Sequence, residues 1–235
     1  MKVRPRWLIL IAAIITMVFL RLGFWQLSRL RERQTLNAEL ASRAVDSAVP
    51  ISRLPTDTAN AHYRRVSVEG AYDYANEIVL TLRSRDGSPG INIVTPLRLP
   101  ATDTALLVVR GWVYSPDGMT VDLPTWREGP QANASGFVET YPPVREGRNR
   151  SPTHANAYRW LDRKELETRF HYPLEPYYVV LTSPHDSGSK SVIPRLTVPP
   201  MDEGPHRSYA IQWFSFAAIS IIGTILFLRR NDRAG

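Results

Sequence analysis

Apolar residues gather in two long runs near the ends of the chain. They cover Trp7–Leu27 and Tyr209–Leu228, and about 20 apolar residues are enough for a helix to cross the hydrocarbon core of a bilayer. The alternative for the first run is a cleaved signal peptide, but Arg21, Phe24 and Trp25 stand where cleavage would need small residues. The alternative for the second run is a buried core helix, which so few polar groups over this length argue against. The pattern therefore predicts two membrane spans, the first of them an uncleaved anchor.

The basic residues at the edges of these runs indicate an orientation. Residues 229–235 carry three arginines and one aspartate, whereas Asp202 and Glu203 accompany Arg207 on the other side of the second run. Cytoplasmic flanks are enriched in Lys and Arg, so the C-terminus is expected in the cytoplasm. The first run has basic residues on both sides and is less decisive. Two spans place both termini in one compartment and the middle of the chain in the other.

Beyond the first run, leucines continue at near-helical spacing: Leu27, Leu30, Leu36 and Leu40. This spacing predicts that the first helix runs on as an amphipathic helix and ends before Pro50.

After Pro50 the apolar residues change to the short runs of β-strands. Turn residues separate the runs RRVSVEG, EIVLTLR, INIVTPLRL, ALLVVRGWVY, SGFVET, PYYVVLT and SVIPRLTV. Asp162 followed by Glu165 resembles a capping box at the start of a short helix, DRKELETRF. Residues 183–190 are expected to form a flexible loop. The predicted fold is a mostly antiparallel β domain, a barrel or a sandwich with one small helix, between two transmembrane helices.

The predicted organisation follows from these boundaries. It comprises a cytoplasmic N-terminus (1–6), a transmembrane helix (7–27), a helical extension (28–49), an extracytoplasmic β-rich domain (50–205), a second transmembrane helix (206–228) and a cytoplasmic tail (229–235).

The net charge of +7 raises the question of nucleic-acid binding. Residues 50–205 hold 17 Lys and Arg against 18 Asp and Glu, so the positive excess belongs to the membrane flanks. This distribution suits anionic lipid headgroups and gives no basic patch for DNA or RNA. With zero cysteines the chain has no disulfides and no thiolates to hold copper.

Catalytic motifs are missing from the sequence. It contains no GxSxG, P-loop, GxGxxG or HExxH pattern. His185, Asp186 and Ser187 are adjacent and are better explained as a polar loop tip than as a triad. His62, His154 and His171 lack the spacing of metal ligands. The sequence therefore indicates no enzyme.

His206 differs from the other histidines because it lies about one turn before the second apolar run. On helical spacing it shares a face of mostly small residues with Ala210, Trp213, Ala217, Ser220 and Thr224. Arg21, Trp25 and Arg29 are stacked on one face of the first helix at the same membrane depth. Together these residues could seat a haem, with His206 as axial ligand and the arginines at the propionates. The alternative is that Trp and Arg are interfacial anchors and that the small face packs helices.

Several motifs in order resemble one known family. LGFWQLSRLRERQTLNAELASR, YRRVSVEGAYD, GINIVTPLRL, LLVVRGWV, YRWLD and HRSYAIQWFSFA are similar to motifs of the Surfeit locus protein one family, called Shy-one in yeast. The similarity extends from Leu22 to about Ala217. The segment between the fourth and fifth strands resembles the family only loosely. The N-terminus lacks an Arg- and Ser-rich transit extension, so the resemblance favours a bacterial protein or a processed mitochondrial one.

The resemblance implies a function. Family members assist assembly of haem-copper terminal oxidases, chiefly cytochrome c oxidase, and bacterial ones bind haem a, with a histidine at the start of the second span implicated as ligand. His206 falls on that position. The resemblance thus implies an assembly factor of the cytoplasmic membrane, or of the mitochondrial inner membrane in a eukaryote. Its expected partners are the catalytic oxidase subunit, haem a synthesis enzymes and the bilayer.

The resemblance also assigns residues. The expected haem-binding set is His206, Trp25, Arg21, Arg29, Trp213, Gln212 and Tyr209, with His206 as the exchangeable ligand of the iron. Gly23, Gln26, Arg110 and Gly111 also match family motifs; Arg110 is expected in an ion pair of the β domain and Gly111 in strand packing. Two alternatives stay open, a haem-independent scaffold or accessory subunit of the oxidase and, more weakly, an enzyme of haem modification.

Overall fold

The computed structural model describes all residues except 1–4, 101, 145, 183–192, 200 and 233–235. The chain divides into two compact units. Residues 1–39 and 200–235 form the helical unit, and residues 40–199 form the β unit.

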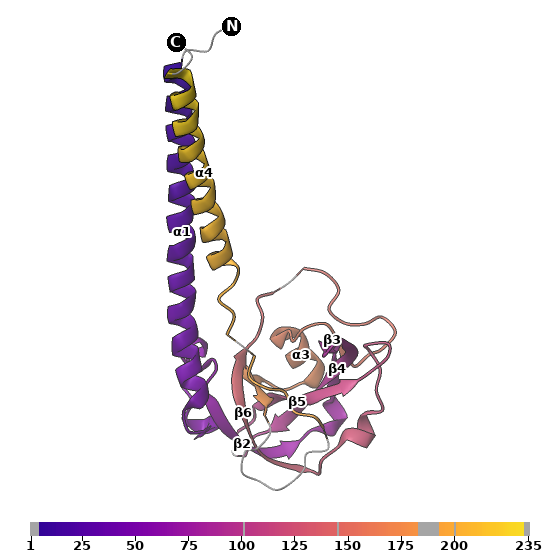
Figure 1. Ribbon diagram of the computed structural model, residues 1–235. Coiled ribbons are helices and arrows are strands. Elements are labelled where there is room, and N and C mark those ends of the chain that lie inside the picture. Colours follow the sequence, from indigo (N-terminus) through magenta and orange to yellow (C-terminus); the bar gives the residue numbers. More distant parts are fainter. Residues whose placement is uncertain (1–4, 101, 145, 183–192, 200, 233–235) are drawn as a thin grey trace. The chain divides into compact units, whose positions relative to one another are not determined.

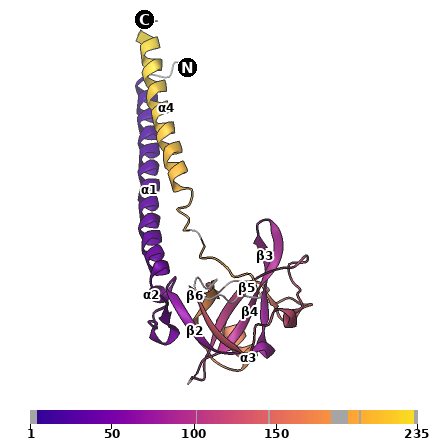
Figure 2. The same ribbon diagram turned by 60° about the horizontal axis from the view of Figure 1, so that its bottom comes forward.

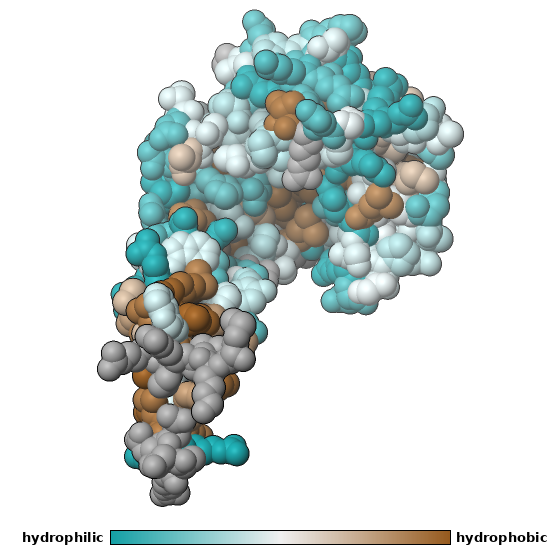
Figure 3. Space-filling view, turned by 90° about the horizontal axis from the view of Figure 1, so that it is seen from above, coloured by the Kyte–Doolittle hydropathy of each residue, from teal (hydrophilic) through white to brown (hydrophobic). Residues whose placement is uncertain are grey.

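The helical unit consists of two long helices. Helix α1 (Pro5–Val45) and helix α4 (His206–Asp232) lie antiparallel and side by side (Figures 1 and 2). Both are long and apolar enough to cross a membrane, and only 6% of each apolar window is buried, unlike the core helix of a soluble protein. Figure 3 shows the hydrophobic residues gathered along these helices, whereas the visible surface of the β unit is mostly hydrophilic. These two helices therefore indicate a membrane protein. As the leucine spacing predicted, α1 continues well beyond the apolar run.

Small and hydroxyl residues let the two helices approach closely. Thr16 Oγ1 donates to Ser220 Oγ at 2.9 Å, and Ala210 and Ala217 are buried. Such small residues are typical of helix interfaces in lipid, where association depends on close packing. The small face predicted for α4 is thus its contact with α1.

The described residues of the β unit form eight strands in one sheet. These are β1 (Val49–Pro50), β2 (Arg65–Tyr72), β3 (Ile78–Arg85), β4 (Ser88–Arg98), β5 (Ala105–Tyr114), β6 (Gln131–Thr140), β7 (Ala157–Tyr158) and β8 (Leu174–Leu181). The order is β1-β2-β6-β8-β5-β4-β3-β7, and an additional β2–β4 pairing closes the ring from β2 to β4. The pairings β1–β2, β3–β7 and β5–β8 are parallel, and the others are antiparallel. The predicted fold class is therefore confirmed, and closure of the ring makes the β domain a barrel.

Strand β5 runs through the middle of the core. Leu106 and Val108 belong to one buried cluster, and Leu107 and Val109 belong to another. Because successive side chains of a strand point to opposite faces, β5 is buried on both sides. This explains why its sequence is a continuous apolar run rather than an alternation.

The helix predicted after Asp162 is present as α3 (Arg163–Phe170), which buries Leu166 and Phe170 against the sheet. The carboxylate of Asp162 accepts from the backbone N–H of Glu165 at 3.1 Å. The side chain of Glu165 does not return the bond expected of a capping box; it accepts from Asn149 Nδ2 at 2.7 Å. The remaining short helices are α2 (Thr58–Ala61), η1 (Ile51–Arg53), η2 (Tyr74–Asn76) and η3 (Leu123–Trp126).

Loss of this cap has a measurable cost. Asp162→Ala leaves the N–H of Glu165 without its acceptor, so the free energy of unfolding is expected to fall by about 1 kcal/mol. Urea unfolding of the full chain in mild detergent would measure the change, with Asp162→Asn as the control that keeps an acceptor oxygen. Equal destabilisation by both variants would contradict the assignment of the cap.

One predicted strand is wrong. Ile193–Val198, the described part of SVIPRLTV, has no strand pairing, and residues 183–192 lie outside the described residues. Pro194 has no N–H to give a ladder; its carbonyl instead accepts from the backbone N–H of Trp112 at 3.0 Å. We call Ile193–Val198 the strap.

Strand β6 begins four residues earlier than predicted. The strands β1 and β7 have only two residues each, too few for an alternating pattern in the sequence to predict them.

Candidate functional site

His206 begins α4, and its imidazole is held by α1. Its Nδ1 lies 2.8 Å from Oε1 of Gln26, a side chain only 8% exposed. The helical spacing of α1 places Gln26 one turn after Gly23, on the face that meets α4. An interhelical hydrogen bond therefore fixes the histidine at the entrance of the second apolar helix.

This hydrogen bond decides the tautomer of His206. An amide oxygen can only accept, so Nδ1 is the donor of this bond and, in the neutral imidazole, Nε2 keeps its lone pair. Among the described residues Nε2 has no hydrogen-bond partner, and Gly204 leaves space beside it. A histidine that donates from one ring nitrogen and presents the other has the arrangement of a metal-binding imidazole.

Aromatic rings pack between the helices two to three turns along α4 from His206. Trp213 stacks on Phe19 with the ring centroids 5.8 Å apart, and the ring of Phe216 contacts both. Phe214 meets Phe24 edge-on at 5.3 Å. Trp213 is thus a packing residue of the helix interface.

Gly23 makes the approach of Phe214 possible. A Cβ at this position would lie 2.7 Å from a carbon of the Phe214 ring. Any larger residue would therefore have to displace that ring.

Arg21, Trp25 and Arg29 lie on a different face of α1. All three are exposed, Trp25 by 50%. Arg29 pairs with Glu32 at 2.7 Å and lies 5.8 Å from the Trp25 ring. An open hollow of about 720 Å³ is lined by Arg21, Leu22, Phe24 and Trp25, and His206 is not among these lining residues. The structure thus brings His206 into contact with Gln26, and Trp213 into contact with Phe19. It does not bring Arg21 or Arg29 next to the imidazole of His206.

Gln212 and Tyr209, the other predicted site residues, are exposed on α4, Tyr209 by 46%. The two motifs that pair a Trp with a Gln therefore have different orientations. In Trp25-Gln26 the Gln faces the other helix, and in Gln212-Trp213 the Trp does.

An apolar groove of about 380 Å³ follows the helix pair further from His206. Its lining includes Ala12, Ala13 and Thr16 of α1 and Ile221 and Thr224 of α4. The small side chains leave the groove open where larger ones would fill it. Its shape and composition suit a hydrocarbon chain.

Polar contacts between α1 and the residues before α4 were not predicted. Gln34 donates to Glu203 Oε1 at 3.0 Å, and Asn37 donates to the backbone oxygen of Asp202 at 3.1 Å. Glu203 and Asp202 thereby hold the chain that leads to His206 against the extension of α1. The sequence signal for these contacts is the pair of amides, Gln34 and Asn37, three residues apart in the helical extension. In the sequence alone, these two side chains look like ordinary solvent-exposed residues.

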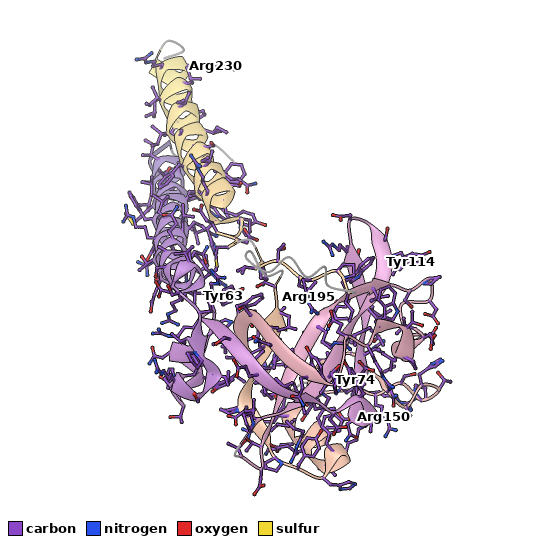
Figure 4. The ribbon with its side chains drawn as sticks, turned by 90° about the horizontal axis from the view of Figure 1, so that it is seen from below. Tyr63, Tyr74, Tyr114, Arg150, Arg195 and Arg230 are labelled. Carbon is purple, nitrogen blue, oxygen red and sulfur yellow. The ribbon has the colours of Figure 1, made fainter. Side chains whose placement is uncertain are left out.

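Arg110 lies in the β unit and forms the predicted ion pairs. The buried guanidinium contacts Glu77 at 2.8 Å and Glu128 at 3.1 Å. Burial raises the pKa of Glu77, whereas the hydrogen bond from Thr95 and the positive charge of Arg110 lower it and offset part of that rise. Arg195 of the strap, labelled in Figure 4, also belongs to this network. Its guanidinium lies 2.9 Å from the carboxylate of Glu128. The network ties the strap to the barrel.

Gly111 has the predicted packing role. A Cβ at this position would collide with Ile193 and with the carbonyl of Pro194. The strap therefore lies directly on the backbone of β5.

Two histidines of the β unit, His62 and His154, have ordinary partners. His62 pairs with Glu139 at 3.0 Å, and His154 bonds to Thr153 at 2.9 Å. Within the part of the chain that the structure describes, no group of three His, Cys, Asp or Glu side chains could hold a metal ion.

Comparison with known proteins identifies relatives along nearly the whole chain. The sequence model of the SURF1 family matches residues 13–218. A SURF1-like protein of Rickettsia felis is 26% identical over 230 residues, which cover 94% of this chain and 96% of that protein. A SURF1-like protein of Monosiga brevicollis is 25% identical over 237 residues, covering 91% and 85%. Surfeit locus protein 1 of Homo sapiens is 29% identical over 133 residues, covering 50% of this chain and 41% of that protein.

Proposed function

The chain belongs to the SURF1 family, and from this premise we propose that it assists assembly of a haem-copper terminal oxidase by carrying haem a to the catalytic subunit. The proposal assigns no chemical turnover to the protein. Its site is the helix interface around His206, with the β unit on the extracytoplasmic side of the membrane and both termini in the cytoplasm.

The observation that carries the proposal is the state of His206. Its Nδ1 is fixed by Gln26, and its Nε2 has no partner among the described residues. Haem a, when bound, supplies an iron that accepts a neutral imidazole nitrogen and a prenyl tail that needs an apolar environment. The residues of the helical unit fit both needs.

The other residues of the predicted site are assigned to the macrocycle and the hydrocarbon tail of haem a. Tyr209 and Gln212 present exposed side chains on α4 within two turns of His206, and Trp25 presents one on α1 next to Gln26; we assign them to the rim of the macrocycle. Trp213 supports the interface from within, next to Phe19. The apolar groove would shield the hydrocarbon tail.

The arginines have a less direct part. Arg21 and Arg29 lie on the exposed face of α1, and long guanidinium side chains at a membrane interface reach toward anionic groups. We assign them to the propionates as mobile contacts rather than as a preformed clamp. A single histidine ligand and mobile cations suit a carrier that must release its cargo to the oxidase.

A visible spectrum tests the proposal. The full chain, co-expressed with haem a synthesis enzymes and purified in mild detergent, is expected to show a Soret band. His206→Ala is expected to lower haem a affinity at least about ten-fold, since it removes the ligand itself. His154→Ala, which removes a histidine of the β unit, is the matched control and should bind like the wild type.

Two outcomes would contradict the carrier. If His206→Ala binds haem like the wild type, the ligand assignment is wrong. If the wild type binds none but still co-purifies with oxidase subunits, the protein is a haem-independent scaffold or accessory subunit. Co-purification thus tests the partner separately from the cofactor.

A further inference from the structure

A small cavity in the β unit collects unpaired and positively charged groups. It has a volume of about 200 Å³ and is lined by Arg83, Ser84 and Arg85 of β3, Asn92 of β4, Trp112 of β5 and Leu196 and Thr197 of the strap. None of its lining residues that the structure describes is acidic. All of these lining residues belong to the β unit, whereas the proposed haem site belongs to the helical unit.

Two of the side chains that line this cavity carry a polar atom without a partner. Trp112 Nε1 and Asn92 Oδ1 are buried and have no hydrogen bond. A buried polar group without a partner is costly, so native proteins rarely keep one unless a water or ligand pairs it. Trp112 offers a donor and Asn92 an acceptor. A ligand that satisfies both must itself carry an acceptor and a donor.

The backbone fixes the indole of Trp112 in this place. Its ring lies across Gly90 of β4, where a Cβ would come within 2.5 Å of two ring carbons. Its backbone N–H donates to Pro194 of the strap at 3.0 Å. Asn92 is the cross-strand neighbour of Trp112. The donor and the acceptor therefore sit side by side on adjacent strands.

The arginines give the cavity its charge. The guanidinium of Arg85 lies 6.0 Å from the centroid of the Trp112 ring. The carboxylate that it pairs with among the described residues, that of Asp86, is 3.9 Å away and almost fully exposed, so water screens this pair strongly. Arg83 donates to the backbone oxygen of Arg159 at 2.9 Å and adds a second positive charge. A bound anion would gain charge-assisted hydrogen bonds here.

We propose that this cavity binds a small oxyanion that carries a hydrogen-bond donor, of which hydrogen phosphate is the simplest. Its charged oxygens accept from Trp112 Nε1 and from the guanidinium of Arg85, and its P–O–H donates to Asn92 Oδ1. The phosphate belongs either to a free anion or to a phosphomonoester headgroup of a lipid, since both present the same chemistry.

The test titrates the full chain in mild detergent at neutral pH with inorganic phosphate by calorimetry. Saturable binding is expected, with sulfate at least about five-fold weaker because sulfate has no proton to donate to Asn92. Arg85→Gln should weaken phosphate about ten-fold, as expected for loss of a charged hydrogen bond. Arg53→Gln, an exposed arginine of η1, is the matched control and should leave binding unchanged.

Trp112→Phe separates a ligand contact from a structural one. The variant keeps the ring over Gly90 but removes Nε1–H, so phosphate affinity should fall about five-fold while the melting temperature without phosphate does not fall. A lower melting temperature with unchanged phosphate affinity would show that Nε1 is structural and would overturn its assigned role.

The remaining outcomes decide the ligand. Absence of saturable phosphate binding, or equal losses in Arg85→Gln and Arg53→Gln, would overturn the site and leave a cavity that holds water. Equal affinity for sulfate would overturn the role of Asn92 as acceptor. A parallel titration with short-chain phosphatidic acid compares the two sources: tighter binding than inorganic phosphate identifies the lipid headgroup, and weaker binding identifies the free anion.

Discussion

Replacing Arg110 with Met is expected to lower the free energy of unfolding of the β unit by about 3–5 kcal/mol. The side chain is fully buried, and its guanidinium contacts both Glu77 and Glu128. Without this cation the carboxylate of Glu77, only 1% exposed, loses its closest positive partner. A buried charge whose partner is removed costs far more than the intact pair contributes.

The loss should depend on pH in a defined direction. Burial already raises the pKa of Glu77, and Arg110 opposes that rise. In Arg110→Met the pKa of Glu77 rises further, so the folded state binds a proton that the unfolded state releases. Stability is then retained below the ordinary pKa of Glu and is lost as the pH rises through the raised folded value. The deficit relative to the wild type should therefore be larger at about pH 8 than at about pH 5.

Arg127→Met is the control for this experiment. Arg127 also points toward Glu77, at 3.8 Å, but its side chain is 43% exposed. Because water screens the half-exposed guanidinium of Arg127 and Glu77 keeps its shorter contact with Arg110, this variant should lose only about 1 kcal/mol. Urea unfolding in mild detergent, followed by tryptophan fluorescence, measures both variants. Similar losses in the two, or a deficit in Arg110→Met that does not change with pH, would contradict the buried network.

The features that the sequence predicts correctly are those with local causes. The two long helices follow from uninterrupted apolar runs, and the start of α3 follows from Asp162 alone, whose carboxylate reaches an N–H three residues away. The strap was mistaken for a strand because its composition fits one. Its contacts with the barrel are not a strand ladder: the Pro194 carbonyl accepts from the N–H of Trp112, and the Arg195 guanidinium donates to the backbone oxygen of Arg110. Gly111 leaves the room that this close approach needs.

The site illustrates the same limit. Helical spacing alone placed His206 on a small-residue face, and that face is the helix interface. Spacing could not choose Gln26 as its partner, because that contact depends on the rotation of α1 against α4, which Gly23 and Phe214 decide through packing. The same rotation turns Arg21 and Arg29 away from the interface, although their four-residue spacing was read correctly.

Gly23→Val is expected to separate α1 from α4 and, on the proposed function, to abolish haem a binding. Three carbons of the Phe214 ring lie 2.7–3.0 Å from the position of a Cβ on Gly23, and the ring of Phe24 packs against the same ring edge-on. The branched side chain forces the ring out, which moves the helices apart. His206 and Gln26 meet one turn away, so their hydrogen bond is lost with the close approach.

The absence of cysteine from the sequence makes the separation measurable. Thr16 and Ser220 have side-chain oxygens 2.9 Å apart, so Thr16→Cys with Ser220→Cys should form a disulfide on mild oxidation. Adding Gly23→Val should suppress this disulfide and the Soret band together.

Two further variants identify the cause. Gly223→Val changes a glycine of α4 with nothing near its Cβ position, so it should preserve both signals. Phe214→Ala added to Gly23→Val removes the obstructing ring and should restore the disulfide, because the clash rather than the valine itself drives the helices apart. If the disulfide forms equally well in Gly23→Val alone, close packing at Gly23 does not control the helix interface. If the disulfide is lost but haem binding persists, the helix contact exists and the haem site lies elsewhere.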